Sequence, residues 1–297
     1  MALTVVGGSN FLGRFLIKNL WKNYQEVRLA DMYPFREAVY QLQEEVPIAK
    51  HPLLYPTNLK QALDGAKDVI VVTHDFFKLS HSKLFYLERT AEFAKKLGVN
   101  KLYWVAPLEL DQLNGLDGDP HELIKHSEQL VERTFPDISI LKTNLIFGEA
   151  CTSLILQHAL YCIANNKPVV TNNKGLSKFC PVWDQEVLET LNELQPGQKI
   201  KLGGPQVLNW EQICNVLAEH SNSPAPSHGS SLAQKVATND YLGDLFYPSH
   251  IQQMYRLLSY DHLPNAKKWG EKKLQEVFTP GSFKGVKELN WHRVVID

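Results

Sequence analysis

The head of the chain carries residues whose types and spacing suit phosphate binding. A short apolar run from Leu3 to Val6 leads into a glycine-rich turn and an apolar-periodic segment, which together comprise Gly7, Gly8, Ser9, Asn10, Phe11, Leu12, Gly13 and Arg14. Unpaired N–H groups at a helix N-terminus attract anions, and glycine lets the backbone approach a phosphate closely. A strand, a glycine turn and a helix in this order predict a pyrophosphate site at the head of a dinucleotide-binding unit.

Asn10 departs from the usual pattern of such a turn. The spacing is G-x-x-N-x-x-G, so Asn10 stands where short-chain dehydrogenases have their middle glycine. Asparagine tolerates a left-handed backbone better than most residues, so the turn can form. Its side chain nevertheless crowds the phosphate position. Two interpretations stay open: a bound dinucleotide, or a tight strand-to-helix turn that holds no ligand.

An acidic residue follows the second apolar run. Asp31 comes directly after Val27 to Ala30 and lies 18 residues beyond Gly13. An acid at this distance bonds the adenosine ribose 2′-hydroxyl of NAD and disfavours the extra phosphate of NADP. Arg14 and Arg36 favour that phosphate, so the choice between NAD and NADP stays open. The alternative role of Asp31 is that of a turn residue at a strand end.

The elements that position these residues alternate regularly. Strands are expected at 3–6, 27–30, 51–55, 69–73, 101–105 and 138–142, with helices between them and a further helix at 152–164. This rhythm predicts an α/β fold with a doubly wound, parallel, Rossmann-type sheet. His74 and Asp75 follow the fourth strand, where ligands bind beyond the carboxyl ends of strands.

The alternation divides the chain. We expect a dinucleotide-binding Rossmann domain at 1–148 and a smaller C-terminal α+β region at 149–230, interleaved with the first. An extended tail at 231–297 is rich in aromatic residues and is expected to pack on the domain or on a partner. Ser221 to Ser231, rich in serine and proline, is the best candidate linker.

Composition excludes several classes of function. The 297 residues carry a net charge of −1, which gives no reason to expect a nucleic acid partner. No apolar run is long enough to span a bilayer. Four cysteines, Cys151, Cys162, Cys180 and Cys214, share no metal-type spacing, so we expect buried thiols and no metal site.

The catalytic residues of a short-chain dehydrogenase are missing. That chemistry needs a Tyr, a Lys four residues later that lowers the Tyr pKa and holds the cofactor ribose, and a Ser at the end of the fifth strand. If Lys125 is the lysine, His121 replaces the Tyr; in the other register the two positions are Pro120 and Ile124. Ala106 and Pro107 stand where the Ser is required. We therefore expect no catalytic residue and no enzyme activity.

Several segments resemble a known family. The run from Glu132 to Lys142, followed by Ile146, Phe147 and Gly148, is similar to the NmrA-like atypical short-chain dehydrogenases. Further similar segments lie at 11–14, 97–101, 181–184, 246–264 and 291–293. The closest resemblance is to the Rossmann-fold accessory subunit of mitochondrial complex I, the NADH:ubiquinone oxidoreductase. The tail is the most telling part, because generic NmrA-like reductases lack it.

The resemblance implies a role. It implies a non-catalytic accessory subunit of the respiratory chain, on the matrix side of the mitochondrial inner membrane, that stabilises the junction of the matrix and membrane arms near the quinone site. NADP(H) or NAD(H) would be held structurally, although an empty site is also consistent with Asn10. Partners would be other complex I subunits and, at Lys267, Lys268, Lys272 and Lys273, anionic lipid.

The same resemblance assigns the cofactor contacts. The glycine turn through Arg14 would face the pyrophosphate, and Asp31 the adenosine ribose. Asn58 and Leu59 would approach the adenine, with Thr73 and His74 on the nicotinamide side. The alternative function is that of a soluble NmrA-like NAD(P)H-dependent reductase or redox-sensing binder, with His121 as the acid.

Overall fold

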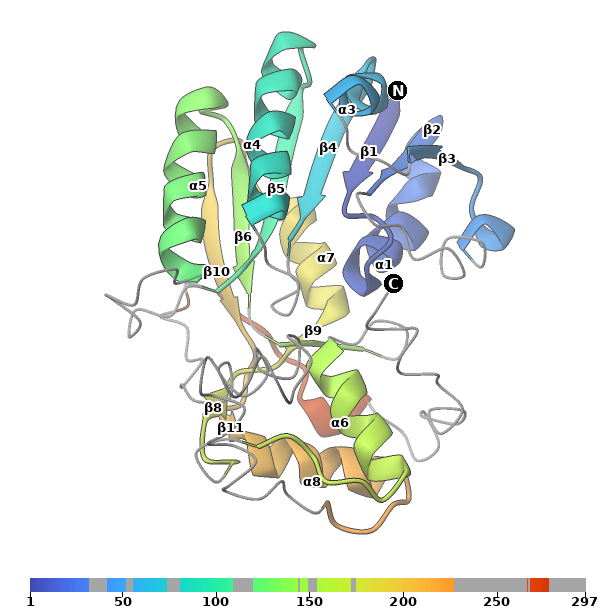
Figure 1. The fold of residues 1–297 in the computed structure, drawn as a ribbon, viewed down its shortest axis with the longest axis vertical. Helices are drawn as coiled ribbons and strands as arrows, with labels where there is room; N and C mark the ends of the chain where they lie inside the picture. The colour runs from blue at the N-terminus through green and yellow to red at the C-terminus, as the bar shows by residue number, and fades with distance from the viewer. Residues whose placement is uncertain are drawn as a thin grey trace, which may run out of the picture.

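The computed structural model describes residues 1–31, 42–51, 56–73, 81–108, 120–143, 145–148, 154–171, 175–226, 266 and 268–277. Their central feature is an eight-stranded sheet with the order β12-β10-β6-β5-β4-β1-β2-β3, in which every neighbouring pair is parallel (Figure 1). The strands are β1 (Ala2–Val6), β2 (Glu26–Ala30), β3 (Ile48–His51), β4 (Ala66–Val72), β5 (Lys101–Pro107), β6 (Ser139–Thr143), β10 (Lys199–Gly203) and β12 (Lys268–Trp269).

Helices cover both faces of this sheet, which explains why its central strands are mainly apolar. Strand β1 is buried along its whole length. Helices α1 (Phe11–Leu20) and α7 (Asp184–Glu193) share an apolar core with one face. Helices α3 (Pro56–Leu63), α4 (His81–Lys96) and α5 (Pro120–Thr134) share a core with the other. The short 3₁₀ helix η1 (Trp21–Asn23) follows α1 directly.

A smaller region lies beyond the carboxyl ends of the strands, at the lower end of the molecule in Figure 1. Its helices are α6 (Leu154–Ala164), α8 (Trp210–His220) and α12 (Leu274–Val277). Strand β7 (Ile146–Phe147) pairs in parallel with β9 (Val182–Trp183), and β8 (Lys178–Phe179) pairs antiparallel with β11 (Leu208–Asn209). Phe147, Phe179 and Trp210 are fully buried in its core, and the Trp210 indole N–H donates to the Val170 carbonyl at 2.9 Å.

The predicted α/β fold with a doubly wound parallel sheet is confirmed. The third strand lies at 48–51, earlier than the predicted 51–55. Helix α7 and strand β10 were not predicted. The proposed boundaries at 148 and 230 stay predictions, although β10 and β12 bring residues from beyond 148 into the sheet. Most of the tail at 231–297 lies outside the described residues.

Among the described residues, no helix combines the length and the apolar character needed to cross a bilayer.

Candidate functional site

The turn between β1 and α1 is built by close backbone packing. Gly7 has φ +79°, and a Cβ there would collide with the Val72 carbonyl oxygen of β4. Its N–H donates to the Ala30 carbonyl of β2 at 2.7 Å. A Cβ on Gly13 would lie 2.5 Å from the Gly7 carbonyl oxygen, so α1 approaches the turn as closely as only glycine permits. Gly8 is also crowded, by the Leu29 side chain and the Val5 carbonyl.

Asn10 caps helix α1. Its backbone is extended, with φ −72° and ψ 167°, so the left-handed conformation considered from the sequence is wrong. The Oδ1 atom accepts the Gly13 N–H at 2.7 Å, which is the bond expected of an N-cap residue. The Nδ2 group donates to the Val72 carbonyl at 3.4 Å. The side chain therefore spans from α1 to the end of β4.

Asp31 and Ser9 form the second half of the site. The Ser9 backbone N–H donates to Asp31 Oδ2 at 3.1 Å, and the Ser9 hydroxyl donates to the same oxygen. These bonds hold the carboxylate at the end of β2 against the glycine turn. The position is the one predicted for an acid that bonds the adenosine ribose.

The topology brings these residues together at one point of the sheet. The order of strands reverses between β1 and β4, because the chain proceeds from β1 toward β3 on one side and from β4 toward β6 on the other. In open α/β sheets, ligands bind outside the carboxyl ends of the strands at this switch point. Gly7, Asn10 and Asp31 all lie at that edge, at the ends of β1 and β2.

The remaining predicted contacts are distributed more widely. Phe11 and Leu12 are buried in the core beneath α1, and Arg14 is half-buried in its first turn. Asn58 is half-buried and Leu59 fully buried on α3, on the opposite face of the sheet from α1.

Two further residues that were predicted to contact the cofactor are Thr73, after β4, and Lys125, on α5. The Thr73 hydroxyl, buried at the end of β4, accepts the Trp104 indole N–H at 2.8 Å. Lys125 is half-buried on α5. His74 lies outside the described residues. These assignments to adenine, ribose and nicotinamide stay predictions.

Helix α5 carries both registers considered for the missing catalytic pair. In one of them Ile124 takes the place of the Lys, and it is buried against the sheet one turn before Glu128, which ion-pairs with Lys142 of β6. In the other, Lys125 is half-buried, and the His121 side chain lies outside the described residues. Ala106 at the end of β5 is fully buried. Both registers stay predictions.

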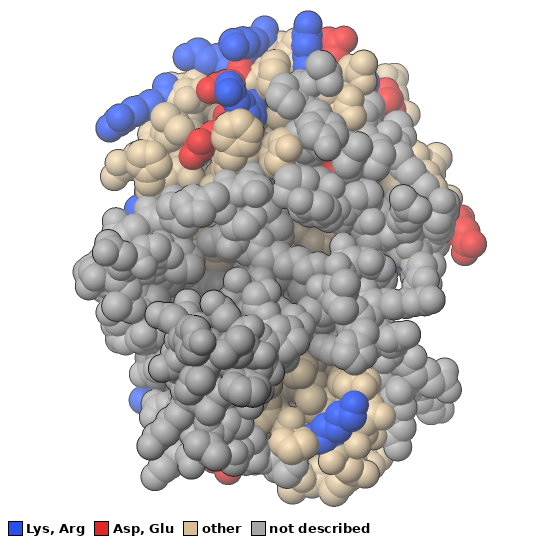
Figure 2. Space-filling model, in the orientation of Figure 1, with Lys and Arg blue, Asp and Glu red and all other residues tan. Residues whose placement is uncertain are grey.

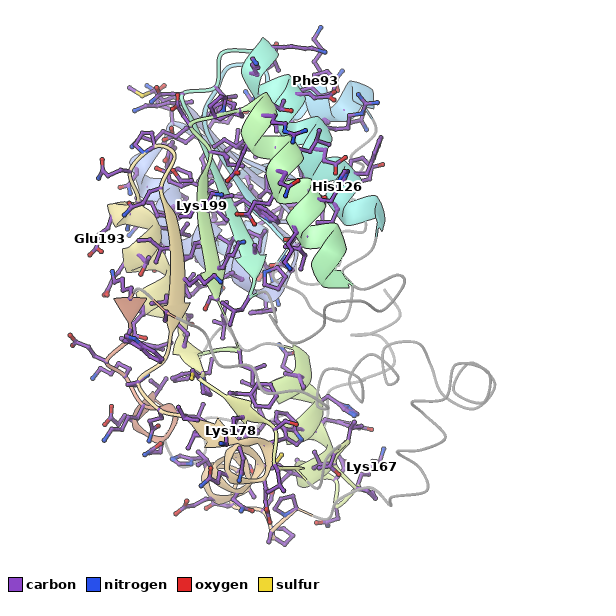
Figure 3. The ribbon with its side chains drawn as sticks, turned by 90° about the vertical axis from the view of Figure 1, so that its left-hand side faces the viewer. Phe93, His126, Lys167, Lys178, Glu193 and Lys199 are labelled. Carbon is purple, nitrogen blue, oxygen red and sulfur yellow. The ribbon has the colours of Figure 1, made fainter. Side chains whose placement is uncertain are left out.

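The ion pairs of Glu128 were not predicted from the sequence. Lys142 is only 5% exposed. Lys199 of β10 approaches the same carboxylate at 3.0 Å and also pairs with Glu132 (Figure 3). A lysine directly after Ile140 and Leu141, in a strand predicted to be buried, is the signal that could have revealed the pair, since lysine is rarely buried without a partner.

The lysines considered for lipid binding do not share a helix. Lys268 lies in strand β12 and ion-pairs with Glu193, while Lys272 and Lys273 precede α12 and Lys267 lies outside the described residues. Charged side chains of both signs are intermixed at the end of the molecule where α3 and α4 lie (Figure 2). Lipid binding, and the absence of a nucleic acid partner, stay predictions.

The cysteines agree with the expectation of buried thiols. Cys162, Cys180 and Cys214 are free and buried, and Cys151 lies outside the described residues. Burial raises the pKa of the Cys162 and Cys180 thiols to about 11, so both are protonated at neutral pH. Among the described residues, no group of three or more His, Cys, Asp or Glu side chains could hold a metal ion.

Comparison with known proteins gives structural matches only. No protein-family model and no curated protein sequence matches the chain. The dTDP-glucose 4,6-dehydratase DesIV from Streptomyces venezuelae, solved with NAD bound, has a TM-score of 0.68 and 13% identity, covering 99% of this chain and 98% of its own. A nucleoside-diphosphate-sugar epimerase from Pseudomonas aeruginosa has a TM-score of 0.64 and 16% identity, covering 99% and 98%.

A third matching structure is also that of an enzyme acting on a sugar nucleotide. The UDP-glucuronic acid 4-epimerase from Bacillus cereus, solved in complex with NAD, has a TM-score of 0.61 and 15% identity, covering 77% of this chain and 87% of its own. At these identities the comparison establishes the fold alone, a Rossmann-type α/β fold.

The comparison corrects the expected function. The role of a non-catalytic complex I subunit depended most on the C-terminal part, which generic NmrA-like reductases lack. Here NAD-bound dehydratases and epimerases match over nearly the whole chain, so an extended C-terminal part does not indicate complex I. The expectations of a respiratory-chain subunit, of a non-enzyme and of the matrix side of the mitochondrial inner membrane are wrong for the same reason: the matching structures are bacterial and archaeal enzymes.

Proposed function

We propose that the chain is an NAD(P)(H)-dependent enzyme of the reductase type, which binds its dinucleotide at the switch point between β1 and β4. One observation carries the proposal: a glycine turn that packs as closely as backbone allows stands beside a fixed carboxylate, at the edge where this fold binds ligands. The NAD-bound structures of the same fold support it. When bound, the nicotinamide supplies or accepts a hydride.

The residues present fit NAD(H) better than NADP(H). Ser9 holds the Asp31 carboxylate in place through two hydrogen bonds. A fixed carboxylate can accept the ribose 2′-hydroxyl, whereas a 2′-phosphate would meet a like charge. We expect NADH to bind at least tenfold more tightly than NADPH. The narrower assignment to NmrA-like proteins rests on the sequence segments alone and stays a prediction.

Two measurements on the full chain test this function. Isothermal titration with NADH and NADPH measures binding, and Asp31→Asn should reduce the preference for NADH because the amide removes the charge. Loss of NADH absorbance with carbonyl compounds, or gain of NADH absorbance when NAD+ is mixed with UDP-glucose, measures turnover. Failure to bind either nucleotide would remove the proposal, and binding without any turnover would contradict its enzymatic part.

Proton transfer in this proposal falls to His121, in the first turn of α5, which replaces the Tyr in the register where Lys125 is the lysine. An imidazole titrates near neutrality and serves as a general acid. We expect His121→Ala to lower kcat by roughly a hundredfold while the Kd for NADH stays unchanged. His126→Ala, an exposed histidine on the same helix, is the matched control (Figure 3). Equal kcat values for the two variants would exclude His121 as the acid.

A further inference from the structure

We propose that the Asn10 side chain takes the place of a pyrophosphate oxygen at the N-terminus of α1, so that the dinucleotide is a loosely held, exchangeable co-substrate. This inference rests on the proposed function and concerns how tightly the same site binds. It attributes the weak affinity of the whole site to one residue, Asn10, which stands in place of a glycine.

The three positions of a dinucleotide-binding turn have separate tasks. The first glycine makes the tight turn, the second lets the backbone approach the pyrophosphate, and the third packs the helix on the strand. Gly7 meets the first requirement through its positive φ, and Gly13 meets the third through its approach to the Gly7 carbonyl. The second position is Asn10. The turn therefore keeps the two glycines that the fold needs and lacks the one that the ligand needs.

The Asn10 side chain makes the contacts that a ligand oxygen would otherwise make. Its Oδ1 accepts the Gly13 N–H at 2.7 Å, so this donor of the helix N-terminus is already engaged. Its Nδ2 reaches the Val72 carbonyl at 3.4 Å and so bridges the N-terminus of α1 and the carboxyl end of β4. Strand β4 and its neighbour β1 flank the switch point. A pyrophosphate approaching that point must displace the side chain and break its cap.

The free energy needed to displace the Asn10 side chain weakens the binding of the dinucleotide. A capping asparagine contributes the equivalent of roughly a five- to tenfold change in an equilibrium constant. The ligand must also displace the bond to Val72 and the volume of the amide. We expect a loss of affinity of about tenfold or more relative to a turn with glycine at this position. Loose binding suits a nucleotide that leaves after each turnover and is reduced or oxidised elsewhere.

Removal of the side chain tests the proposal directly. Asn10→Gly should lower the Kd for NADH by about tenfold in isothermal titration of the full chain. Glycine is itself an accepted N-cap residue, so the helix persists. Asn209→Gly is the matched control, because Asn209 caps α8 in the same way, accepting the Gln212 N–H at 2.8 Å, far from the switch point. It should bind NADH as the wild-type protein does.

Two further variants keep the test informative if Asn10→Gly fails to fold. Asn10→Ser retains a capping oxygen but has no group that reaches Val72, so its Kd should lie between those of the wild type and the glycine variant. Asn10→Asp places a carboxylate where phosphate must bind and should weaken binding beyond the wild-type value. The order Gly, Ser, Asn, Asp from tightest to weakest supports the inference.

The outcomes separate this inference from the function on which it rests. Equal Kd values for wild type and Asn10→Gly, or tighter binding by the wild type, overturn the inference while NAD(H) binding itself stands. Binding of NADH by Asn10→Gly but not by wild type would support the displacement of the pyrophosphate by Asn10, but it would overturn both the co-substrate part of the inference and the proposed function. Absence of binding by every variant, with NADPH as well as NADH, overturns both.

Discussion

At the residue scale, Asp68 shows how a buried carboxylate depends on a single hydrogen-bond partner. It is buried at the start of β4, and its Oδ2 accepts the Tyr24 hydroxyl at 2.7 Å, while its Oδ1 is buried without a hydrogen-bond partner among the described residues. A buried carboxylate depends heavily on such a bond. Tyr24→Phe should therefore lower the free energy of unfolding by about 2 kcal/mol in urea denaturation.

The same contact predicts an alkaline dependence of stability. Burial, and then the hydrogen bond to Asp68, raise the pKa of Tyr24 above its ordinary value. A pKa that is higher in the folded state contributes stability below the ordinary tyrosine pKa of about 10 and loses it as the pH rises further. The wild-type unfolding free energy should fall above pH 10, and Tyr24→Phe should fall less steeply. Parallel slopes for the two proteins would show that Tyr24 ionises alike in both states.

Single residues also show what the sequence could and could not predict. The glycine turn, Asp31 and the empty catalytic positions could be read from residue types and spacing, because these patterns are local. The contact of Asn10 Nδ2 with the Val72 carbonyl could not, since Val72 lies 62 residues away. The bond between Tyr24 and Asp68 is equally invisible, because it joins the segment before β2 to the start of β4.

At the scale of elements, the ion pair between Glu128 and Lys142 links α5 to β6. Removing one member of a buried pair leaves a charge in an apolar place, whereas replacing both by apolar residues is often neutral. We expect Glu128→Leu to cost about 3 kcal/mol and the double change Glu128→Leu with Lys142→Met to recover most of that loss. A double-mutant cycle by chemical denaturation measures the coupling; additive effects would show that the two charges act independently.

A second contact links α7 to the segment that follows β12. Glu186 Oε1 accepts the backbone N–H groups of Glu271 and Lys272, the latter at 2.8 Å, and a Cβ on Gly270 would collide with the same carboxylate. Glu186→Ala should lower the unfolding free energy by about 2 kcal/mol and speed hydrogen exchange of the two amides. Glu189→Ala, an exposed glutamate on the same helix, should change neither. Unchanged exchange in Glu186→Ala would mean that other contacts hold the segment.

The predicted elements were most accurate where the pattern was strongest. Strands β1, β2, β4, β5 and β6 were predicted closely, and β3 with a shift toward later residues, because buried parallel strands read as apolar runs. Strand β10 was missed because the prediction followed apolar runs, whereas Lys-Ile-Lys-Leu has the alternation of a half-buried strand. Helix α7 was missed because its capping residue is Trp183, which gives no N-cap signal in the sequence.

At the scale of the whole molecule, nucleotide binding and stability are linked. A ligand that binds only the folded protein stabilises it by about 2.7 kcal/mol at a hundred times its Kd. Thermal unfolding with a graded series of NADH concentrations should therefore raise the midpoint steadily. NADPH should require at least tenfold higher concentrations for the same shift. An unfolding midpoint that is insensitive to both nucleotides would argue against a site at the switch point.

The placement of α7 has a consequence for synthesis on the ribosome. Helix α1 is made among the first residues, yet the apolar surface that it shares with α7 is completed only by Val187, Leu191 and Leu194. Strand β10 joins the sheet later still, and β12 adds the last edge. A nascent chain therefore exposes a half-built core for most of translation, a condition in which chaperones protect proteins from aggregation. Chains truncated before α7 should therefore be insoluble, even though their glycine turn is complete.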